Sequence, residues 1–161
     1  MNPFLNTGKV RLELWKKLRE DIKNTKNYKD KIALVNQWWA QAPLKKFVLD
    51  PLDCKKWLTP WELLYEGNFC EISRAYMIHQ TLILSNNESN YFSPERFELS
   101  YIQDRINEKQ TMILTWHCKH GLDNMYVFNY EYNVVHHITE MPKNIEKIIS
   151  YIHDGEKYIE V

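Results

Sequence analysis

The sequence predicts an α+β domain in which helices come first and an antiparallel sheet follows. Apolar residues recur at helical spacing through the first half of the chain, up to about residue 84. From residue 97 onward apolar and polar residues alternate, and the segment KHGLDN separates two runs rich in β-forming residues. We therefore expect one domain over residues 1–161, in which residues 1–45 form a helical layer on the sheet.

The first two helices are predicted by apolar residues three or four positions apart. One helix spans about residues 8 to 24, and its apolar face consists of Val10, Leu14, Leu18 and Ile22. A second helix begins near Asp30 and ends before Pro43, because proline cannot continue a helix.

The stretch WLTPWELLYEGNFCEISRAY, residues 57–76, predicts two successive helix starts. Thr59 can cap the first helix, and Pro60 suits the first helical position. Glu62 stands three residues after the cap, where its carboxylate can reach back in a capping box. Gly67 then ends this short helix.

The second helix of this stretch carries the principal candidate for chemistry. We expect Asn68 to cap it, Glu71 to occupy its third position and Leu84 to end it, which places Cys70 in the first turn. The positive end of a helix dipole favours a thiolate, so a cysteine in that position can serve as a nucleophile. The alternative is a buried structural thiol.

The second half of the chain predicts a three- to four-stranded antiparallel sheet followed by a short helix. The runs TMILTWHC and MYVFNYEY form a hairpin on either side of KHGLDN. Thr111 lies nine residues before His120 and Asn129 nine after it, so a hairpin centred there sets the two opposite each other. The segment PKNIEKIISYIHDG predicts the closing helix, with an apolar face of Ile145, Ile148, Ile149 and Ile152.

Composition excludes several classes of function. The chain has 21 basic and 21 acidic residues, so its net charge gives no reason to expect nucleic-acid binding. Only four glycines occur, and no glycine-rich phosphate loop is present. Three cysteines, an odd number without a spacing motif, indicate reduced thiols. No apolar run reaches membrane length, and we expect no cofactor and a protein made and kept in a cytoplasm.

The stretch 57–76 resembles the nucleophile region of bacterial transglutaminase-like cysteine peptidases. The family has a Trp-x-Thr-Pro-x-Glu approach and a Gly-Asp-Cys-Glu-Asp element that opens its core helix. Here that element reads Asn-Phe-Cys-Glu-Ile, so the acids flanking Cys-Glu are absent. With the helix and strands that follow, the resemblance extends over about residues 57 to 132. The shared positions are Trp57, Thr59, Pro60, Glu62, Leu64, Gly67, Cys70, Glu71 and Ala75.

The resemblance implies a Cys-His-Asp site whose positions here read Cys70, Thr111 and Asn129. A threonine cannot act as a general base near neutral pH. His79 lies nine residues along the nucleophile helix, roughly 13.5 Å from Cys70. His117 lies six residues along the strand from Thr111, roughly 20 Å away.

Two other histidines leave an alternative open. His136 and His137 follow Asn129 and could fold back toward Cys70 as a relocated base. Without such a base, the resemblance implies a fold that has lost full peptidase or transglutaminase turnover.

Two further groups of residues are candidate sites. His117, Cys118 and His120 invite a zinc site, but adjacent strand residues point to opposite faces, so we expect no metal. The tryptophans can pack the helices onto the sheet or contact a partner protein, since tryptophan favours interface cores. The candidates for such contacts are Trp38, Trp39, Trp57 and Trp61.

The whole chain also resembles small uncharacterised proteins of tailed bacteriophages, which share the tandem tryptophans, an Asp-Pro connector and a Trp-x-Thr-Pro-Trp-Glu-Leu run. This resemblance implies a non-catalytic interaction module of the virion, at the head–tail junction or tail. Its partners would be other phage structural proteins, with no membrane or nucleic-acid binding. The alternatives are a cysteine hydrolase that uses Cys70 and an effector that binds a host protein inside the infected cell.

Overall fold

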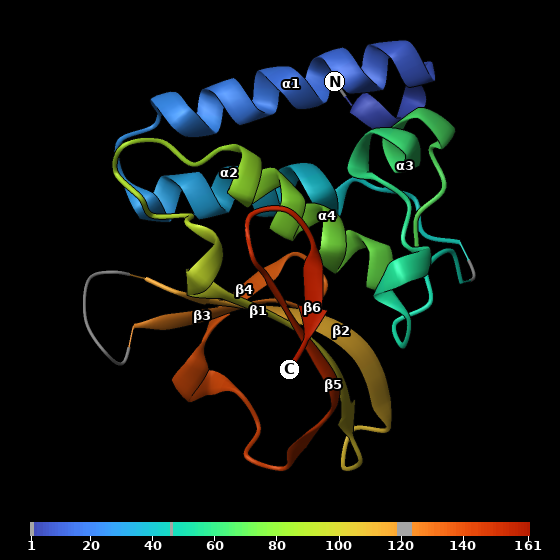
Figure 1. The fold of residues 1–161 in the computed structure, drawn as a ribbon, viewed down its shortest axis with the longest axis vertical. Helices are drawn as coiled ribbons and strands as arrows, with labels where there is room; N and C mark the ends of the chain where they lie inside the picture. The colour runs from blue at the N-terminus through green and yellow to red at the C-terminus, as the bar shows by residue number, and fades with distance from the viewer. Residues whose placement is uncertain (1, 46, 119–123) are drawn as a thin grey trace.

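The structure is a computed structural model, and it describes residues 2–45, 47–118 and 124–161. A helical layer covers one face of an antiparallel sheet (Figure 1). The α-helices are α1 (Gly8–Asn24), α2 (Tyr28–Ala40), α3 (Pro60–Glu66) and α4 (Glu71–Leu84). Short 3-10 turns are η1 (Pro3–Leu5), η2 (Cys54–Lys56), η3 (Pro94–Arg96) and η4 (Ile138–Glu140). None of the described helices is long and apolar enough to cross a bilayer.

The sheet has six strands in the order β4-β3-β2-β1-β5-β6, and every neighbouring pair is antiparallel. The α+β prediction is therefore confirmed, with more strands than the three or four expected. The strands are β1 (Phe97–Asp104), β2 (Lys109–His117), β3 (Met125–Glu131), β4 (Val134–His137), β5 (Ile145–His153) and β6 (Tyr158–Glu160).

The predicted C-terminal helix is wrong, because that segment forms strand β5, which lies between β1 and β6 in the sheet. β5 pairs with β1, and the register shifts so that Tyr101 faces Ile149 while Ile102 faces Lys147. This β-bulge at Ile148 interrupts the two-residue period of the strand. The isoleucines on either side of the bulge therefore repeat with a spacing that imitates an amphipathic helix.

The predicted hairpin register is wrong by two residues. Leu114 pairs with Phe128, so continuing the ladder by one residue sets Ile113, rather than Thr111, beside Asn129. A two-residue slip leaves each side chain on the same face of the sheet. The alternation of apolar and polar residues therefore could not distinguish the two registers.

The main core lies between the helices and the sheet. Its largest fully buried side chains include Trp15, Trp39 and Trp116. Inside this core the hydroxyl of Thr81 on α4 accepts hydrogen bonds from the indole nitrogens of Trp15 (2.8 Å) and Trp39 (3.0 Å). These bonds satisfy two buried donors and join α1 and α2 to α4.

A smaller cluster covers the opposite face of the sheet and consists of Ile102, Ile113, Val127 and Tyr130. It packs beneath the segment that joins β4 to β5. Helix α4 packs on the sheet against β2 and β3 (Figure 1). Its first residue, Glu71, bonds to Thr111 on β2 and to Asn129 on β3, where the sequence predicted the candidate site.

Candidate functional site

The start of α3 is a complete capping box, as predicted. The Glu62 amide donates to Thr59 Oγ1 at 3.2 Å, and the Thr59 amide donates to Glu62 Oε1 at 3.1 Å. Gly67 ends the helix in the left-handed region, with φ of 77°. The positive φ favours glycine there, and a Cβ atom would also lie 2.7 Å from Arg11 Nη2, so that the guanidinium would have to shift.

The start of α4 differs from the prediction, because Cys70 itself is the N-cap. Cys70 Sγ accepts from the Ser73 amide at 3.5 Å, and Ser73 Oγ accepts from the Cys70 amide at 2.8 Å. Asn68, the expected cap, lies outside the helix and accepts from Lys45 Nζ at 2.8 Å. Phe69 forms a β-bridge with Leu44, and this extended pairing delays the helix until Glu71.

The Cys70 side chain is buried, with 5% of the residue exposed, and it belongs to the main core. Within the described parts of the chain, its hydrogen bonds are the local ones of the helix start. The thiol therefore occupies the position of a nucleophile at the N-terminus of a helix, and serves there as a capping group.

Asn129 reaches the first turns of α4 through a backbone irregularity. Its φ is 71°, and the pairing of β3 with β4 shifts register between Phe128 and Glu131. Strict alternation would point Asn129 to the same face as Val127, away from the helices. The bulge turns its side chain toward α4 instead, and asparagine is one of the few residues that tolerate this conformation.

The Asn129 amide group is fully engaged. Its Oδ1 accepts from Arg74 Nε at 2.7 Å. Its Nδ2 donates to the carbonyl oxygens of Glu71 (2.8 Å) and Met112 (2.9 Å). Asn129, on β3, thus ties α4 to β2 and to its own strand, and these three bonds occupy both ends of the amide.

Thr111 completes the group of residues around the helix start. It is 1% exposed, and its hydroxyl donates to Glu71 Oε2 at 3.4 Å. Cys70, Thr111 and Asn129 therefore all lie at the first turn of α4, although the hairpin register used to relate the last two was wrong. Both Thr111 and Asn129 contact Glu71, the neighbour of Cys70.

The histidines have other partners. His79 is fully buried in α4, with Nδ1 2.8 Å from Tyr158 Oη, and burial together with nearby His153 lowers its pKa to about 3. His136 lies between the carboxylates of Glu131 (3.5 Å) and Glu140 (3.7 Å).

His136 and His137, the candidates for a relocated base, contact other residues than Cys70. The His136 ring packs against Tyr130, which belongs to the cluster on the sheet face opposite α4. His137 caps η4, where its Nδ1 accepts from the Thr139 amide at 3.3 Å. Among the described residues, no imidazole lies within hydrogen-bond distance of the Cys70 thiol.

A zinc site is not assembled by the part of this motif that the structure describes. Cys118 is completely buried in the main core, whereas His117 ends β2 at a half-buried position. His120 lies outside the described residues. Across residues 2–45, 47–118 and 124–161, no three His, Cys, Asp or Glu side chains gather as metal ligands would.

The four tryptophans that are candidates for partner contacts differ in how far they are buried. Trp39 is completely buried and Trp57 is half-buried, with its indole nitrogen donating to the Asp50 carbonyl at 2.6 Å. Trp38 is partly exposed between α1 and α2, and Trp61 is 46% exposed on α3. Burial therefore excludes only Trp39 from direct contact with a partner, and the role of all four stays a prediction.

Ser73 and Arg74 are the site residues that sequence reasoning missed. Ser73 completes the cap, and Arg74 holds Asn129. Burial lowers the pKa of Arg74, while nearby Glu71 acts to raise it. Both residues follow Cys70 by three or four positions, the spacing of one helix face, and this was the signal that could have found them.

No protein-family model matches this chain, and no curated protein matches it. Solved structures of Legionella pneumophila LapG are similar to it. The calcium-bound form aligns with a TM-score of 0.64 and 16% identity over 85% of this chain and 71% of LapG. Two further structures, one of them EGTA-treated, align with a TM-score of 0.65 and 16% identity over 91% of this chain and 74% of LapG. At this identity the likeness supports the transglutaminase-like α+β fold, and it gives no support to the phage resemblance.

Proposed function

We propose that this chain uses a transglutaminase-like fold as a non-catalytic module that binds another protein. The observation that carries the proposal is the complete engagement of Asn129 by Arg74, Glu71 and Met112, beside a thiol that no described imidazole reaches. A cysteine nucleophile needs a base within hydrogen-bond reach, and that base in turn needs an orienting group. Here Asn129, at the position of the orienting group, donates to the backbone carbonyl oxygens of Glu71 and Met112 instead.

The residue at the base position supports the same proposal. The Thr111 hydroxyl cannot take a proton from a thiol near neutral pH, and it is already directed to the Glu71 carboxylate. Cys70, Ser73, Thr111 and Asn129 together behave as a buried polar connection between α4 and the sheet. Such a connection stabilises the fold when every member is satisfied.

Alkylation of the native protein with iodoacetamide tests this proposal. Cys54 is half-buried, whereas Cys70 and Cys118 are buried, so Cys54 is the internal reference. We expect Cys54 to react first across the pH range and Cys70 to react at the slow rate of Cys118. Mass spectrometry of the digested protein gives each rate separately. Alkylation of Cys70 faster than Cys54 below pH 7 would contradict a non-catalytic thiol.

A second candidate is a cysteine hydrolase acting on peptide or amide bonds with Cys70 as nucleophile. The likeness to LapG favours it over a structural role in a virion, because what the comparison supports is a transglutaminase-like fold. In this candidate His136 or His137 supplies the base after β4 moves. Turnover of a peptide substrate that Cys70→Ser abolishes and His136→Ala or His137→Ala greatly reduces would establish it.

The phage setting is a separate part of the proposal. In it the module assembles with other phage structural proteins, or binds a host protein inside the infected cell, and the tailed-phage resemblance of the sequence is its sole support. Mass spectrometry of purified particles decides between these settings. A stoichiometric amount of the chain in the particle supports the virion role, and its absence supports a host-directed one.

A further inference from the structure

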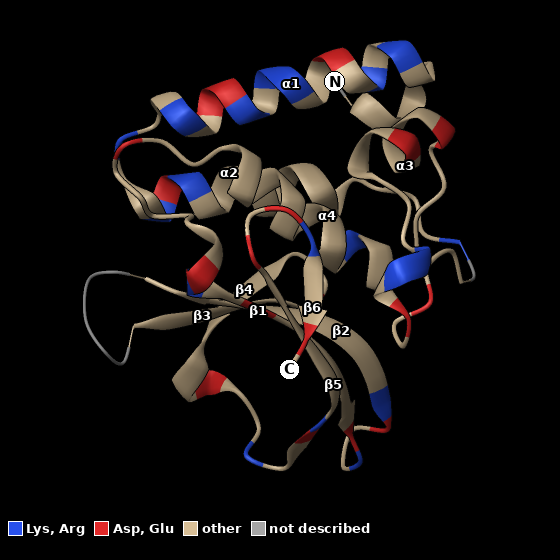
Figure 2. Ribbon diagram, in the orientation of Figure 1, with Lys and Arg blue, Asp and Glu red and all other residues tan. Residues whose placement is uncertain are grey.

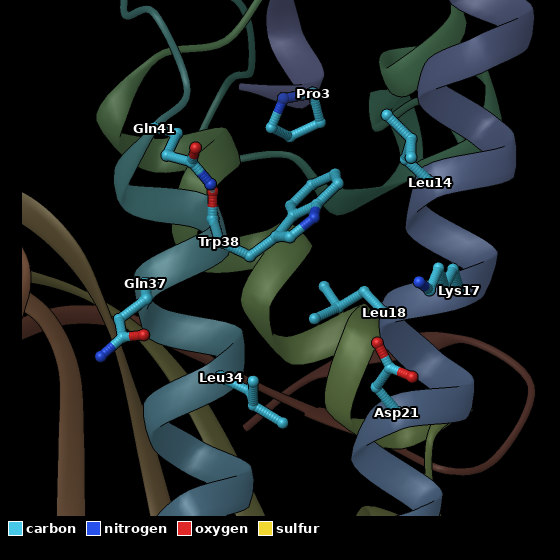
Figure 3. A pocket seen from close by; sticks show the side chains of 9 residues that line it. All are labelled: Pro3, Leu14, Lys17, Leu18, Asp21, Leu34, Gln37, Trp38 and Gln41. Carbon is cyan, nitrogen blue, oxygen red and sulfur yellow. Dashed lines mark hydrogen bonds between the residues drawn. The ribbon is translucent and has the colours of Figure 1, made fainter. Parts of the chain in front are cut away.

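A groove runs along the surface between α1 and α2 and encloses about 300 Å³ (Figure 3). Trp38 projects into it from α2, and Leu14 and Leu18 face it from α1 (Figure 3). Its volume is at the lower end of the range for ligand sites. The remaining lining residues are Pro3, Lys17, Asp21, Leu34, Gln37 and Gln41.

The apolar floor of the groove is held in place from below. The Trp38 ring packs edge-on against Phe4 (5.0 Å between centroids) and against the fully buried Trp39 (4.9 Å). Because these rings fill the space beneath it, Trp38 cannot turn inward to hide its exposed surface. Leu14 and Leu34 are likewise only partly buried, so the floor stays open to solvent.

The groove has a repeat that matches one particular kind of occupant. Leu14 and Leu18 on one side, and Leu34 and Trp38 on the other, are each four residues apart. Four residues rise about 6 Å along a helix, so both walls repeat at the spacing of helical side-chain rows. A helix laid along the groove places its own rows between them, as helices pack by ridges into grooves.

The two sides of the groove differ in charge. Figure 2 shows acidic and basic residues interleaved along α1, whereas α2 carries its charges only in its first turn. Lys17 and Asp21 border the groove on the α1 side, and uncharged Gln37 and Gln41 border it on the α2 side. Both charged residues are exposed, and neither forms a salt bridge with any residue that the structure describes.

We infer that this groove receives an amphipathic helix of a partner protein. The helix carries apolar residues at three- and four-residue spacing, a carboxylate that faces Lys17 and a basic residue four positions away that faces Asp21. A second copy of this chain does not supply such a ridge with its own α1–α2 surface, since that surface is itself a groove. The inference rests on the proposed function, and it names the binding surface and the kind of partner.

The test uses a fluorescein-labelled helical peptide of about 15 residues, with leucines on one face and a Glu and a Lys four positions apart beside them. We expect saturable binding to the full chain by fluorescence anisotropy. Leu34→Gln should weaken it about tenfold or more, whereas Leu52→Gln, the same change at an exposed site outside the groove, should leave it unchanged.

A charge exchange sharpens the result. Lys17→Glu makes both charged residues of the rim, at positions 17 and 21, acidic. It should therefore weaken binding of the Glu/Lys peptide and strengthen binding of a peptide with Lys at both positions. Lys143→Glu, at an exposed position of the connection before β5, is the matched control. Equal responses to the two charge changes would contradict recognition by the rim of the groove.

Other outcomes overturn the inference outright. Absence of saturable binding, or equal binding by a folded Leu34→Gln variant, would exclude the groove as a helix site. A dimer in light scattering that Leu34→Gln dissociates would assign the groove to a second copy. Cys70→Ala should bind the peptide as the wild type does. If Cys70 is reactive and peptide binding is unchanged, the non-catalytic proposal is refuted, whereas the assignment of the groove as a helix-binding site is retained.

Discussion

Two helix starts lie eleven residues apart in this chain, at Thr59 and at Cys70. The first is held by residues next to it in the sequence, and the second also by residues far from it. Both are capping boxes. The first lies at the surface, and among the described residues the side chains of Thr59 and Glu62 each bond to the backbone amide of the other. The second is buried, and Asn129 and Arg74 surround it with bonds from the sheet and from the next turn.

The difference shows which helix starts can be recognised in a sequence. The Thr-Pro-Trp-Glu run is sufficient for α3, because every group that matters lies within four residues. The start of α4 depends on the β-bridge between Leu44 and Phe69 and on the bulge at Asn129. Neither partner is local, so the sequence suggested Asn68 as cap where the fold uses Cys70.

The largest expected effect comes from breaking the connection of α4 to the sheet. Asn129→Ala removes three hydrogen bonds and leaves Arg74 Nε without its acceptor inside the protein. We expect a loss of about 3 kcal/mol in the free energy of unfolding, measured with urea.

Asn133→Ala is the control for that measurement. Asn133 has a similar positive φ of 58° and is exposed. It should therefore lose only the smaller cost of alanine in the left-handed region, about 1 kcal/mol. Equal losses at the two positions would mean that backbone conformation, rather than the hydrogen bonds, determines the role of Asn129.

The next effect tests the buried cap itself. Ser73→Ala leaves the buried Cys70 amide without its acceptor, and we expect a loss of about 2 kcal/mol in the free energy of unfolding. Cys70→Ser keeps an acceptor for the Ser73 amide and should change stability by less than about 1 kcal/mol. A large loss in Cys70→Ser would show that the sulfur matters by packing more than by capping.

A smaller effect is expected at the exposed start. Thr59→Ala removes the cap of α3 and should cost about 1 kcal/mol by urea unfolding. Water can replace the lost bond there, which it cannot do at Ser73. A loss at Thr59 as large as that at Ser73 would remove the distinction between a local and a buried start.

The smallest effect is a pH dependence that only one of the starts should have. Hydrogen bonds from Thr59 lower the pKa of Glu62, so its folded form favours the ionised carboxylate. The contribution is therefore fully present above about pH 4.5 and is lost as the pH falls below that value. The start of α4 has the hydroxyl of Ser73 in the place of the Glu62 carboxylate. The protection of the Thr59 amide, measured relative to its intrinsic exchange rate at each pH, should therefore fall between pH 5 and 3, whereas that of the Cys70 amide should not change.

Much of the fold could be predicted because its signals were local. The bounds of α1, the capping box of α3, the end of α4 at Leu84 and the runs that form β2 and β3 follow from periodicity and turn residues. Strand β5 could not be predicted in this way, since the bulge at Ile148 gives it a helix-like spacing of apolar residues. The six-strand order and the hairpin register depend on pairing between distant segments.

Part of the candidate site could likewise be predicted from the sequence, and part of it could not. The resemblance to the peptidases pointed to Cys70, Thr111 and Asn129 without the structure, and the structure brings them to one helix turn. It could not show that Asn129 is turned toward α4 by its own backbone, or that Arg74 and Ser73 complete the connection. Those facts require the φ of one residue and the packing of one helix on two strands.

The sequence by itself determined the helical first half, the capped α3 and the placement of Cys70 near a helix start, and its resemblance to the peptidases predicts Thr111 and Asn129 at the positions of the family's His and Asp. Tertiary structure alone decided that Cys70 is a buried cap, that Asn129 is a structural link and that Trp38 is only partly buried while Trp39 is completely buried. The physical reason is the distance along the chain over which each interaction acts. Capping and periodicity act within about four residues, whereas burial and the direction of a side chain at a bulge are set by segments far apart in the chain.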